Sequence, residues 1–375
     1  MVEIEYLDSP HSTEELLEIL CPPVRNWFKD SFPDFTRPQK LAIPAILDRK
    51  NLLLCSPTGS GKTLTAFLTI IDKLVRLALE NKLEKKVHCV YISPIKALAN
   101  DIQRNLIGPL TEISESYLPD RAQEIKVGLR TGDTSQSDRQ KMLRNPPHIL
   151  ITTPESLAIA ITSPRFQPIV SQLEYMIVDE LHSLVPTKRG VHLALTLSYL
   201  DTLLKTPVQR IGISATMEPL EKVAEYLVAS DDQESRNSSS SVSIAKVSGS
   251  RELDLDILIT HKKFSDLAVM KILDANIEAI ADLISAHTTT LVFANTRKMT
   301  ETIVQRLRPY LGDLVAGHHG SMDKKIRLNV EKKLKHGHLR AVVTSSSLEM
   351  GIDIGSVDLV LQVGSPGDIA TALQR

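Results

Sequence analysis

A phosphate-binding loop at residues 56–63 is the sequence feature that most constrains what this chain can fold into. The motif Ser-Pro-Thr-Gly-Ser-Gly-Lys-Thr follows the apolar run 51–55 and opens the amphipathic stretch 63–79. Between a strand and a helix, such small residues let backbone N–H groups surround a phosphate at the helix N-terminus. Lys62 would then reach the β- and γ-phosphates of a nucleotide, and the Thr63 hydroxyl would hold Mg²⁺. The flanking strand and helix disfavour the alternative, an accidental glycine-rich turn.

The first position of this loop holds Ser56, where glycine or alanine is usual. Serine is small enough to turn there, so the departure weakens the match only slightly. We therefore expect a nucleotide with Mg²⁺ to be bound by Ser56, Thr58, Gly59, Ser60, Gly61, Lys62 and Thr63.

A second acidic motif, Asp179-Glu180-Leu181-His182, follows the apolar run 175–178. A carboxylate at the carboxyl end of a strand lies beside the phosphate-binding loop in parallel sheets of this kind. Asp179 would bind Mg²⁺ through water, and Glu180 would orient and deprotonate the attacking water. An Asp-Glu pair is by itself typical of a solvated turn, and the upstream loop favours the catalytic interpretation. The candidate catalytic residues are Lys62, Asp179, Glu180 and His182.

Short apolar, β-branched runs alternate with helix-length amphipathic stretches along the chain. The expected strands are 51–55, 87–93, 148–152, 175–178, 210–214, 290–294, 341–344 and 358–363, and the expected helices include 63–79, 95–106 and 298–311. Strands separated by helices predict βαβ units and parallel sheets covered on both faces, which is an α/β fold.

A polar, serine-rich segment within residues 230–250 separates two series of strands. Its composition is that of a loop or an insertion rather than of packed structure. Because a fresh strand–helix alternation begins after it, we expect domains at residues 1–229 and 251–375, with 230–250 as a linker or insertion. The alternative is a loop within one large domain.

The composition excludes few classes of protein. The net charge of −1, from 44 basic and 45 acidic residues, argues only against a protein that binds non-specifically, as a polycation, to nucleic acid. No run approaches the roughly 18 apolar residues of a membrane span, and the acidic N-terminus lacks the layout of a signal peptide. Cys21, Cys55 and Cys89 form no metal-ligand pattern. We therefore expect a cytoplasmic protein without a membrane partner.

The phosphate-binding loop and the acidic motif resemble those of superfamily 2 helicases, and a third motif agrees. Residues 35–39, Phe-Thr-Arg-Pro-Gln, followed by the run 42–46, resemble the Q motif, in which a glutamine reads adenine. The resemblance gives that role to Gln39 and base stacking to Phe32, for which ordinary core packing is the alternative. It also implies ATP as the nucleotide and a fold of two tandem RecA-like domains with parallel sheets.

Further segments resemble the motifs with which such helicases grip a strand and respond to ATP. Small hydroxyl and glycine residues at strand-to-helix turns offer donors to phosphate oxygens. The resemblance assigns strand binding to Pro94, Lys96, Thr131, Gly132, Thr153, Pro154, Glu155, Asn295, Thr296, His319 and Gly320. It assigns coupling to Ser214, Ala215 and Thr216, and nucleotide contacts to Gly351 and Asp353. The alternative for residues 153–155 is a capped helix start.

The amino-acid sequences of several motifs are similar to those of one family, the large helicase-related proteins. These motifs are Ser-Pro-Ile-Lys-Ala-Leu-Ala-Asn-Asp at 93–101, Asp-Glu-Leu-His at 179–182, Lys-Arg-Gly-Val-His-Leu at 188–193, His-His-Gly-Ser at 318–321 and Gly-Ile-Asp-Ile-Gly at 351–355. The resemblance implies an ATP-dependent DNA helicase or translocase of bacterial or archaeal type, moving 3′ to 5′ and associated with DNA repair. The implied partner is single-stranded or tailed duplex DNA, or an RNA–DNA hybrid.

Members of this family continue motif VI with a further arginine after the residues that correspond to Gln374 and Arg375, two more expected nucleotide contacts. That further arginine is not in this sequence, so we expect a second domain that is incomplete at its C-terminus. An arginine finger of this kind accelerates phosphoryl transfer by about 10³–10⁵. Three accounts remain open: a fragment of a longer protein, half of a split protein whose partner chain supplies the rest of motif VI and a winged helix, or a binding module without ATP turnover. A DEAD-box-like RNA helicase is a further alternative, disfavoured by Asp-Glu-Leu-His in place of Asp-Glu-Ala-Asp.

Overall fold

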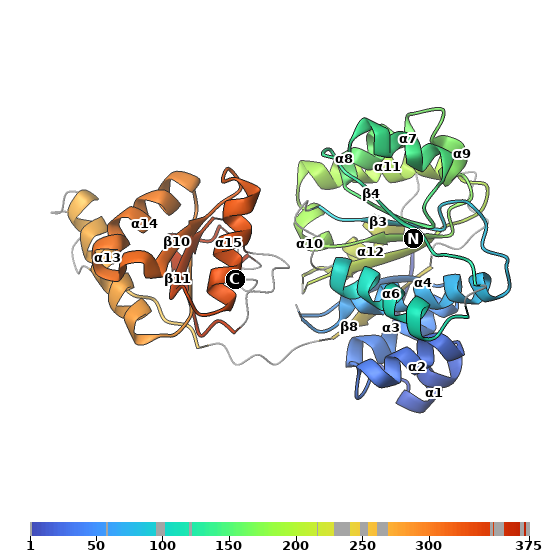
Figure 1. Cartoon of the computed structure of the whole chain (residues 1–375), viewed down its shortest axis with the longest axis horizontal. Coiled ribbons are helices and arrows are strands. Elements are labelled where there is room, and N and C mark those ends of the chain that lie inside the picture. The colour runs from blue at the N-terminus through green and yellow to red at the C-terminus, as the bar shows by residue number, and fades with distance from the viewer. Residues whose placement is uncertain are drawn as a thin grey trace. The chain divides into compact units, whose positions relative to one another are not determined.

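A computed structural model of the chain describes residues 2–57, 59–94, 102–119, 122–215, 217–228, 241–247, 254–260, 269–345, 348, 356–367 and 371–372. The chain divides into two units, residues 1–250 and residues 251–375. Each unit contains a parallel sheet with helices packed against it (Figure 1). The predicted α/β fold with two parallel sheets is therefore confirmed.

The first unit is built on an eight-stranded sheet in the order β1-β8-β2-β7-β6-β3-β5-β4. All its paired strands are parallel. The strands are β1 (Glu3–Tyr6), β2 (Asn51–Cys55), β3 (Cys89–Ile92), β4 (Val127–Arg130), β5 (Ile149–Thr152), β6 (Tyr175–Val178), β7 (Gln209–Ser214) and β8 (Ser241–Lys246). Because every strand runs the same way, the loops that follow them emerge at one edge of the sheet, here called the carboxyl edge.

Helices cover both faces of this sheet (Figure 1). One face is covered by α1 (Thr13–Ile19), α2 (Pro22–Ser31), α3 (Arg37–Leu47), α4 (Lys62–Leu79), the π-helix Gln103–Ile107 and α6 (Gly108–Ser116). The other is covered by α7 (Gln136–Arg144), α8 (Pro154–Ile161), α9 (Gln167–Val170), α10 (Leu181–Leu184), α11 (Lys188–Leu203) and α12 (Leu220–Val228). Among the residues that the structure describes, none of the helices is both long and apolar enough to cross a membrane.

Strand β2 shows why the predicted strands read as continuous apolar runs. Leu52 and Leu54 point into the core beside α3 and α4. Leu53 and Cys55, the residues between them and after them, belong to the core on the opposite face. Since successive side chains of a strand point to opposite faces, a strand buried on both sides has no polar alternation.

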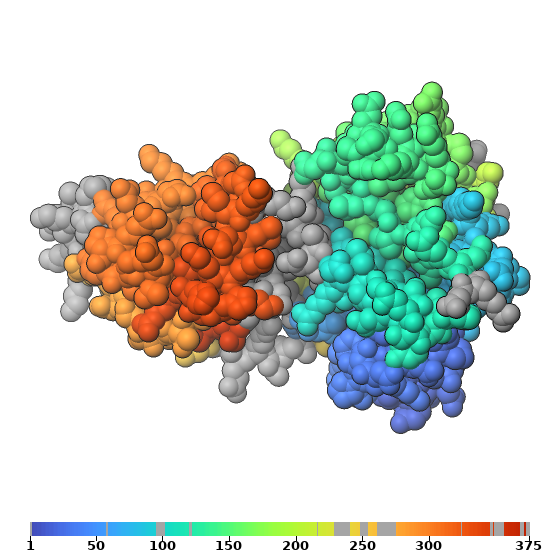
Figure 2. Space-filling view, in the orientation of Figure 1, coloured from blue at the N-terminus to red at the C-terminus, as the bar shows by residue number. Residues whose placement is uncertain are grey.

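The N-terminal helices pack against α6. The Trp27 indole N–H donates to the Glu112 carboxylate at 2.6 Å. Figure 2 shows the blue surface of α1 and α2 directly against the teal surface of α6. This packing fixes the end of α2, and Phe32 is the residue that follows it.

Strands β1, β4, β8 and β10 were absent from the sequence prediction. Strands β1 and β4 form the two edges of the first sheet. Two glutamates break the apolar pattern of β1, and Gly128 and Arg130 break that of β4. Strand β8 lies within the range 230–250 that we expected to link the domains. It pairs with β1 and β2 and belongs to the first unit, which runs to residue 250.

The second unit contains a four-stranded parallel sheet in the order β10-β11-β9-β12. Its elements are α13 (Val269–Ala286), β9 (Thr290–Ala294), α14 (Arg297–Leu311), the 3₁₀ turn Gly312–Leu314, β10 (Val315–His318), α15 (Lys324–Lys335), β11 (Ala341–Thr344) and β12 (Leu359–Val363). Helices α13 and α14 share one core with the sheet, and α15 shares the core on the other face.

A buried histidine joins two strands of the first unit. His148 directly precedes β5 and is 5% exposed. Its Nδ1 accepts a hydrogen bond from the Lys126 backbone N–H at 2.9 Å, next to the start of β4. Burial, with smaller contributions from the charges of His88 and Lys126, lowers the pKa of His148 to about 4. The neutral imidazole is therefore the form that the native structure requires.

This histidine should make the first unit sensitive to acid. Below pH 6.5 the unfolded chain binds a proton at His148, whereas the native chain resists protonation down to about pH 4. Stability is therefore complete above pH 6.5 and is lost as the pH falls toward 4, by up to about 3 kcal/mol. Asparagine can accept the same N–H without titrating, so His148→Asn should flatten this dependence in urea unfolding at pH 7, 6 and 5. Equal slopes for the variant and the wild type would contradict the role of His148.

Candidate active site

The phosphate-binding loop connects β2 to α4 at the carboxyl edge of the first sheet. Gly59 and Gly61 have φ values of +76° and +89°, in the left-handed region that favours glycine. Gly61 caps α4, so the first N–H groups of this helix face the loop. A Cβ at Gly61 would lie 3.3 Å from the Thr36 hydroxyl, so a larger residue would be crowded as well as strained.

Ser56, an unusual first residue for such a loop, makes hydrogen bonds that hold the loop in place. Its hydroxyl hydrogen-bonds to the Ser60 hydroxyl at 2.6 Å, and Ser60 also donates to the Pro57 carbonyl at 2.7 Å. Its backbone N–H donates to the Ser214 carbonyl at 3.2 Å. Ser56 is fully buried, so it ties the loop both to itself and to the end of β7.

Lys62 and Thr63 present the charged and hydroxyl groups that a nucleotide needs. The Lys62 ammonium donates to the carbonyl oxygens of Ser56 at 2.5 Å and Pro57 at 3.1 Å, which hold it over the loop. The half-buried Thr63 hydroxyl in the first turn of α4 has no hydrogen-bond partner among the described residues. An ammonium, a hydroxyl and a ring of N–H groups therefore face the same space, a donor set that fits phosphate and Mg²⁺.

The two expected adenine residues lie beside this loop and at the end of α2. The Gln39 Oε1 accepts the Thr36 N–H at 2.8 Å, and its Nε2 lies 3.4 Å from the Cβ position of Gly61. The structure therefore brings the Q motif against the phosphate loop. Phe28 and Phe35 stack 3.8 Å apart in the core, whereas the Phe32 ring at the rim of that cluster is 37% exposed. An exposed ring is the one available for a base.

Asp179 follows β6 at the carboxyl edge and is 5% exposed. Its Oδ1 accepts the Glu180 N–H at 2.8 Å, and its Oδ2 accepts the hydroxyl of Tyr91, a fully buried residue of β3. Both carboxylate oxygens are thus held in place by hydrogen-bond donors, which fixes the orientation of the Asp179 side chain. Tyr91 is a site residue that the sequence prediction missed, because a tyrosine within a buried strand carries no distinguishing signal.

The side chains of Glu180 and His182 are in contact, and the imidazole has a defined tautomer. Glu180 has φ +52°, a left-handed conformation that is uncommon outside glycine and typical of functional sites. The His182 Nδ1 accepts the Ala215 N–H at 3.0 Å, which leaves its Nε2 to face the Glu180 carboxylate at 3.2 Å. Burial first, and then the charge of Lys62, lowers the pKa of His182 to about 4, so the ring is neutral at neutral pH.

Ser214 and Ala215, the described residues of the expected coupling segment, contact both of the preceding motifs. Ser214 is fully buried, its carbonyl accepts the Ser56 N–H, and its hydroxyl lies 3.4 Å from the His182 Nδ1. Ala215 donates to the same imidazole nitrogen. The phosphate loop, the acidic motif and the coupling segment therefore form one hydrogen-bonded set at the carboxyl edge.

The expected strand-binding segments of the first unit follow three adjacent strands. Pro94 follows β3, Thr131 and Gly132 follow β4, and Thr153 follows β5. The Thr153 hydroxyl caps α8 by accepting the Ser156 N–H at 3.3 Å, so the capped-helix alternative describes its side chain. The structure therefore brings these segments to one edge of the sheet.

Glu155 and Thr131 use their side chains within the protein. The Glu155 carboxylate accepts two hydrogen bonds from Arg189. The Thr131 hydroxyl accepts the Asp133 N–H at 3.3 Å, and its N–H donates to Thr134. Both side chains therefore already have partners within the first unit.

In the second unit the expected residues lie at the ends of β9 and β10. The Asn295 Nδ2 donates to the Ser365 carbonyl, after β12, at 2.8 Å, and Thr296 caps α14. The His319 Nε2 contacts Glu301 at 2.7 Å, and Gly320 lies beside the Arg297 guanidinium. The carboxyl edge of the second sheet therefore carries all four residues. The remaining expected site residues, which are Thr58, Lys96, Thr216, Gly351, Asp353, Gln374 and Arg375, lie outside the described residues.

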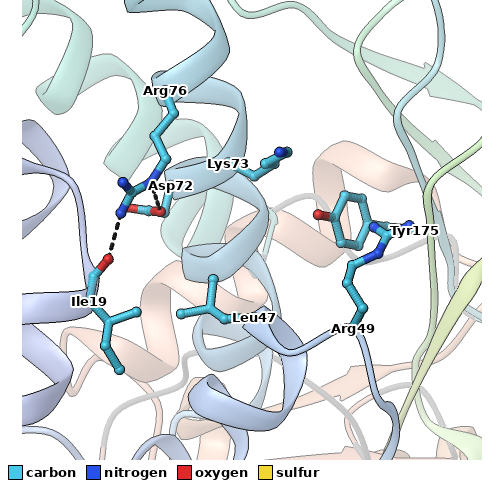
Figure 3. Close-up of a pocket in the computed structure, with 7 residues that line it drawn as sticks. All are labelled: Ile19, Leu47, Arg49, Asp72, Lys73, Arg76 and Tyr175. Carbon is cyan, nitrogen blue, oxygen red and sulfur yellow. Dashed lines mark hydrogen bonds and ion pairs between the residues drawn. The ribbon is translucent and has the colours of Figure 1, made fainter.

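A cavity of about 340 Å³ lies at the opposite edge of the first sheet (Figure 3). Its wall includes Arg49, just before β2, and Tyr175, which starts β6. The Arg49 guanidinium lies 4.6 Å from the Tyr175 ring centroid, and Arg76 pairs with the buried Asp72 at 2.7 Å. These contacts join elements of the fold at the amino edge, so the cavity is separate from the nucleotide loop.

Comparisons with known proteins match both units of the chain to helicases. The profile of the DEAD/DEAH box helicase family matches residues 36–224, and that of the helicase conserved C-terminal domain matches residues 275–375. The ATP-dependent helicase Lhr-Core of Methanocaldococcus jannaschii is 45% identical over 377 residues, covering 100% of this chain and 44% of the relative. The protein of that name from Methanothermobacter thermautotrophicus is 47% identical over 371 residues, covering 97% and 42%. The chain thus spans less than half the length of these relatives.

A solved structure is also similar to this chain. The Mycobacterium smegmatis helicase Lhr bound to ssDNA and AMP-PNP matches with a TM-score of 0.80 and 41% sequence identity. The match covers 96% of this chain and 46% of that one. Both units described above are therefore RecA-like helicase domains.

Proposed function

Because this chain belongs to the DEAD/DEAH box helicase family and is homologous to its Lhr-type ATP-dependent members, we propose that it carries the motor of a DNA helicase or translocase. The proposed motor couples ATP hydrolysis to 3′-to-5′ movement along a DNA strand and serves DNA repair. The observation that carries the proposal is the hydrogen-bonded set that joins Ser56, Ser214, Ala215 and His182. Through this set, the phosphate loop and the acidic motif are both in direct contact with Ser214 and Ala215.

Each catalytic residue has a role that follows from its position. The loop N–H groups and Lys62 bind the β- and γ-phosphates, and Gln39 with Phe32 holds the adenine. Glu180 orients the attacking water and accepts its proton, while the neutral His182 holds the Glu180 carboxylate through its Nε2–H. Thr63 and Asp179 would hold Mg²⁺, which neutralises charge on the phosphate oxygens when bound.

Single-stranded DNA is the proposed partner. The expected strand-binding segments after β3, β4 and β5 lie together at one sheet edge, a placement suited to sugar–phosphate contacts along one strand. The relative at 41% identity is described as bound to ssDNA, which favours DNA over RNA. Buried free thiols at Cys21, Cys55 and Cys89 suit a reducing compartment, so we propose a cytoplasmic location.

Hydrolysis and unwinding assays test this proposal. We expect the whole protein to hydrolyse ATP faster with single-stranded DNA, and to unwind duplexes with a 3′ tail rather than a 5′ tail. Stimulation by RNA alone would support the RNA-helicase alternative. Nucleotide binding without any turnover would support a binding module, and either result would overturn the proposal.

A further inference from the structure

Arg189, in the first turn of α11, connects two of the strand-binding segments. Its Nε and Nη2 donate to the two oxygens of Glu155 at 2.6 Å and 3.2 Å. Its Nη2 also donates to the Pro94 carbonyl at 2.9 Å. One guanidinium therefore joins the segment after β3 to the first turn of α8, although Pro94 and Glu155 are far apart in sequence.

The start of α11 is built to place this side chain. Thr187 caps the helix by accepting the Gly190 N–H, and the Tyr226 hydroxyl donates to the Gly190 carbonyl at 2.7 Å. A Cβ at Gly190 would lie only 2.3 Å from the Leu184 carbonyl oxygen, so this turn packs against α10 more closely than any other residue would allow. The motif Lys-Arg-Gly at 188–190 thus fixes the start of α11, and with it the position of the Arg189 side chain.

The contact is not mainly a source of stability. The side chains of Arg189 and Glu155 are 45% and 50% exposed, and ion pairs at such exposed positions contribute little to folding. Its geometry is specific, however, because a planar guanidinium can grip a carboxylate with two N–H groups and still reach a carbonyl. Lysine, with one ammonium on a flexible stem, cannot reproduce this arrangement.

We propose that Arg189 is a positioning residue for the DNA strand. It sets the spacing between the segment after β3 and the N-terminus of α8, so that both segments meet neighbouring phosphates of one strand. It also neutralises Glu155, a carboxylate that would otherwise repel the backbone at this edge. Arg189 itself does not touch a phosphate. This inference rests on the proposed function, because it assumes that these two segments bind DNA.

Binding of single-stranded DNA by four variants tests the inference. Arg189→Ala should weaken binding about 10-fold, and Arg189→Lys should weaken it almost as much because the bridge is lost while the charge remains. Lys188→Ala is the matched control, since it removes the same charge from an exposed neighbour and should change binding less than about 2-fold. In Arg189→Ala/Glu155→Ala, binding should be no weaker than in Arg189→Ala, because the unpaired carboxylate is gone.

The salt dependence of binding separates positioning from a direct phosphate contact. Loss of a phosphate-binding cation lowers the slope of log K against log salt by about 1, whereas Arg189→Ala should leave the slope unchanged. Wild-type binding by Arg189→Ala, full rescue by lysine, or a lowered slope would overturn the inference. If Arg189→Ala does not fold, Arg189→Lys and the slope still decide it. A wild-type protein that binds no DNA would instead overturn the proposed function, and this inference with it.

Discussion

Lys62→Ala should abolish ATP hydrolysis by the whole protein, lowering kcat/KM by about 10³-fold or more. The Lys62 ammonium is buried, and the carbonyl oxygens of Ser56 and Pro57 hold it over the phosphate loop. There it is placed to exchange those carbonyls for phosphate oxygens, whose charge must be stabilised during transfer. Alanine leaves no cation, and water restores little of the lost interaction in a site of low dielectric. Steady-state hydrolysis, with and without single-stranded DNA, measures the loss.

A second lysine of the same helix provides the control. Lys73 is half-buried on α4, forms no ion pair with any residue that the structure describes, and lies near the opposite edge of the sheet. Lys73→Ala should hydrolyse ATP at the wild-type rate. Loss in both variants would indicate damage to α4, whereas wild-type hydrolysis by Lys62→Ala would remove Lys62 from the mechanism.

Glu180→Gln should separate nucleotide binding from hydrolysis. Removal of the general base should lower kcat by about 10²–10⁴-fold. The glutamine amide keeps the shape of the side chain, and its oxygen can still accept the His182 Nε2–H. The affinities for ATP and for DNA should therefore change little. Single-turnover hydrolysis gives the chemical step, and titration with a fluorescent ATP analogue gives the affinity.

An exposed carboxylate elsewhere in the first unit serves as the comparison for this variant. Glu225 lies on α12 and has no hydrogen bond to a residue in the described part of the chain. Glu225→Gln should match the wild type in both measurements. A Glu180→Gln variant that binds ATP weakly but keeps its kcat would show that Glu180 holds the nucleotide instead of activating water.

The sequence predicts those parts of the fold that are buried on both sides. Strands β2 and β6 were predicted to the residue because their apolar runs have no alternative environment. Strand β8 was not, because it follows a serine-rich segment and because its pairing with β1 joins residues from opposite ends of the first unit. Such a pairing depends on the whole sheet and leaves no local pattern.

The candidate site also has parts that the sequence predicts and parts that it does not. The loop and the acidic motif were predictable because phosphate chemistry demands particular residues at particular spacings. The Tyr91 contact with Asp179 was not, because a hydroxyl in a buried strand has no such signature. For Glu155 the motif indicated a role at the strand, and the structure adds that Arg189 occupies its carboxylate. The residues of segment 188–193 matched the family motif, so the sequence did mark this segment. No residue type in it predicted that Arg189 would contact both Glu155 and Pro94.

The position of β8 has a mechanical consequence. Any tension that the second unit transmits along the chain enters the first unit just after Lys246, the last residue of β8. Because β8 lies between β1 and β2, with parallel ladders on both sides, a pull along the strand loads its hydrogen bonds together in shear instead of unzipping them singly. The N-terminal strand β1 thus supplies one of the two ladders that hold β8. Without β1, the strand that bears the load would be hydrogen-bonded on one side only.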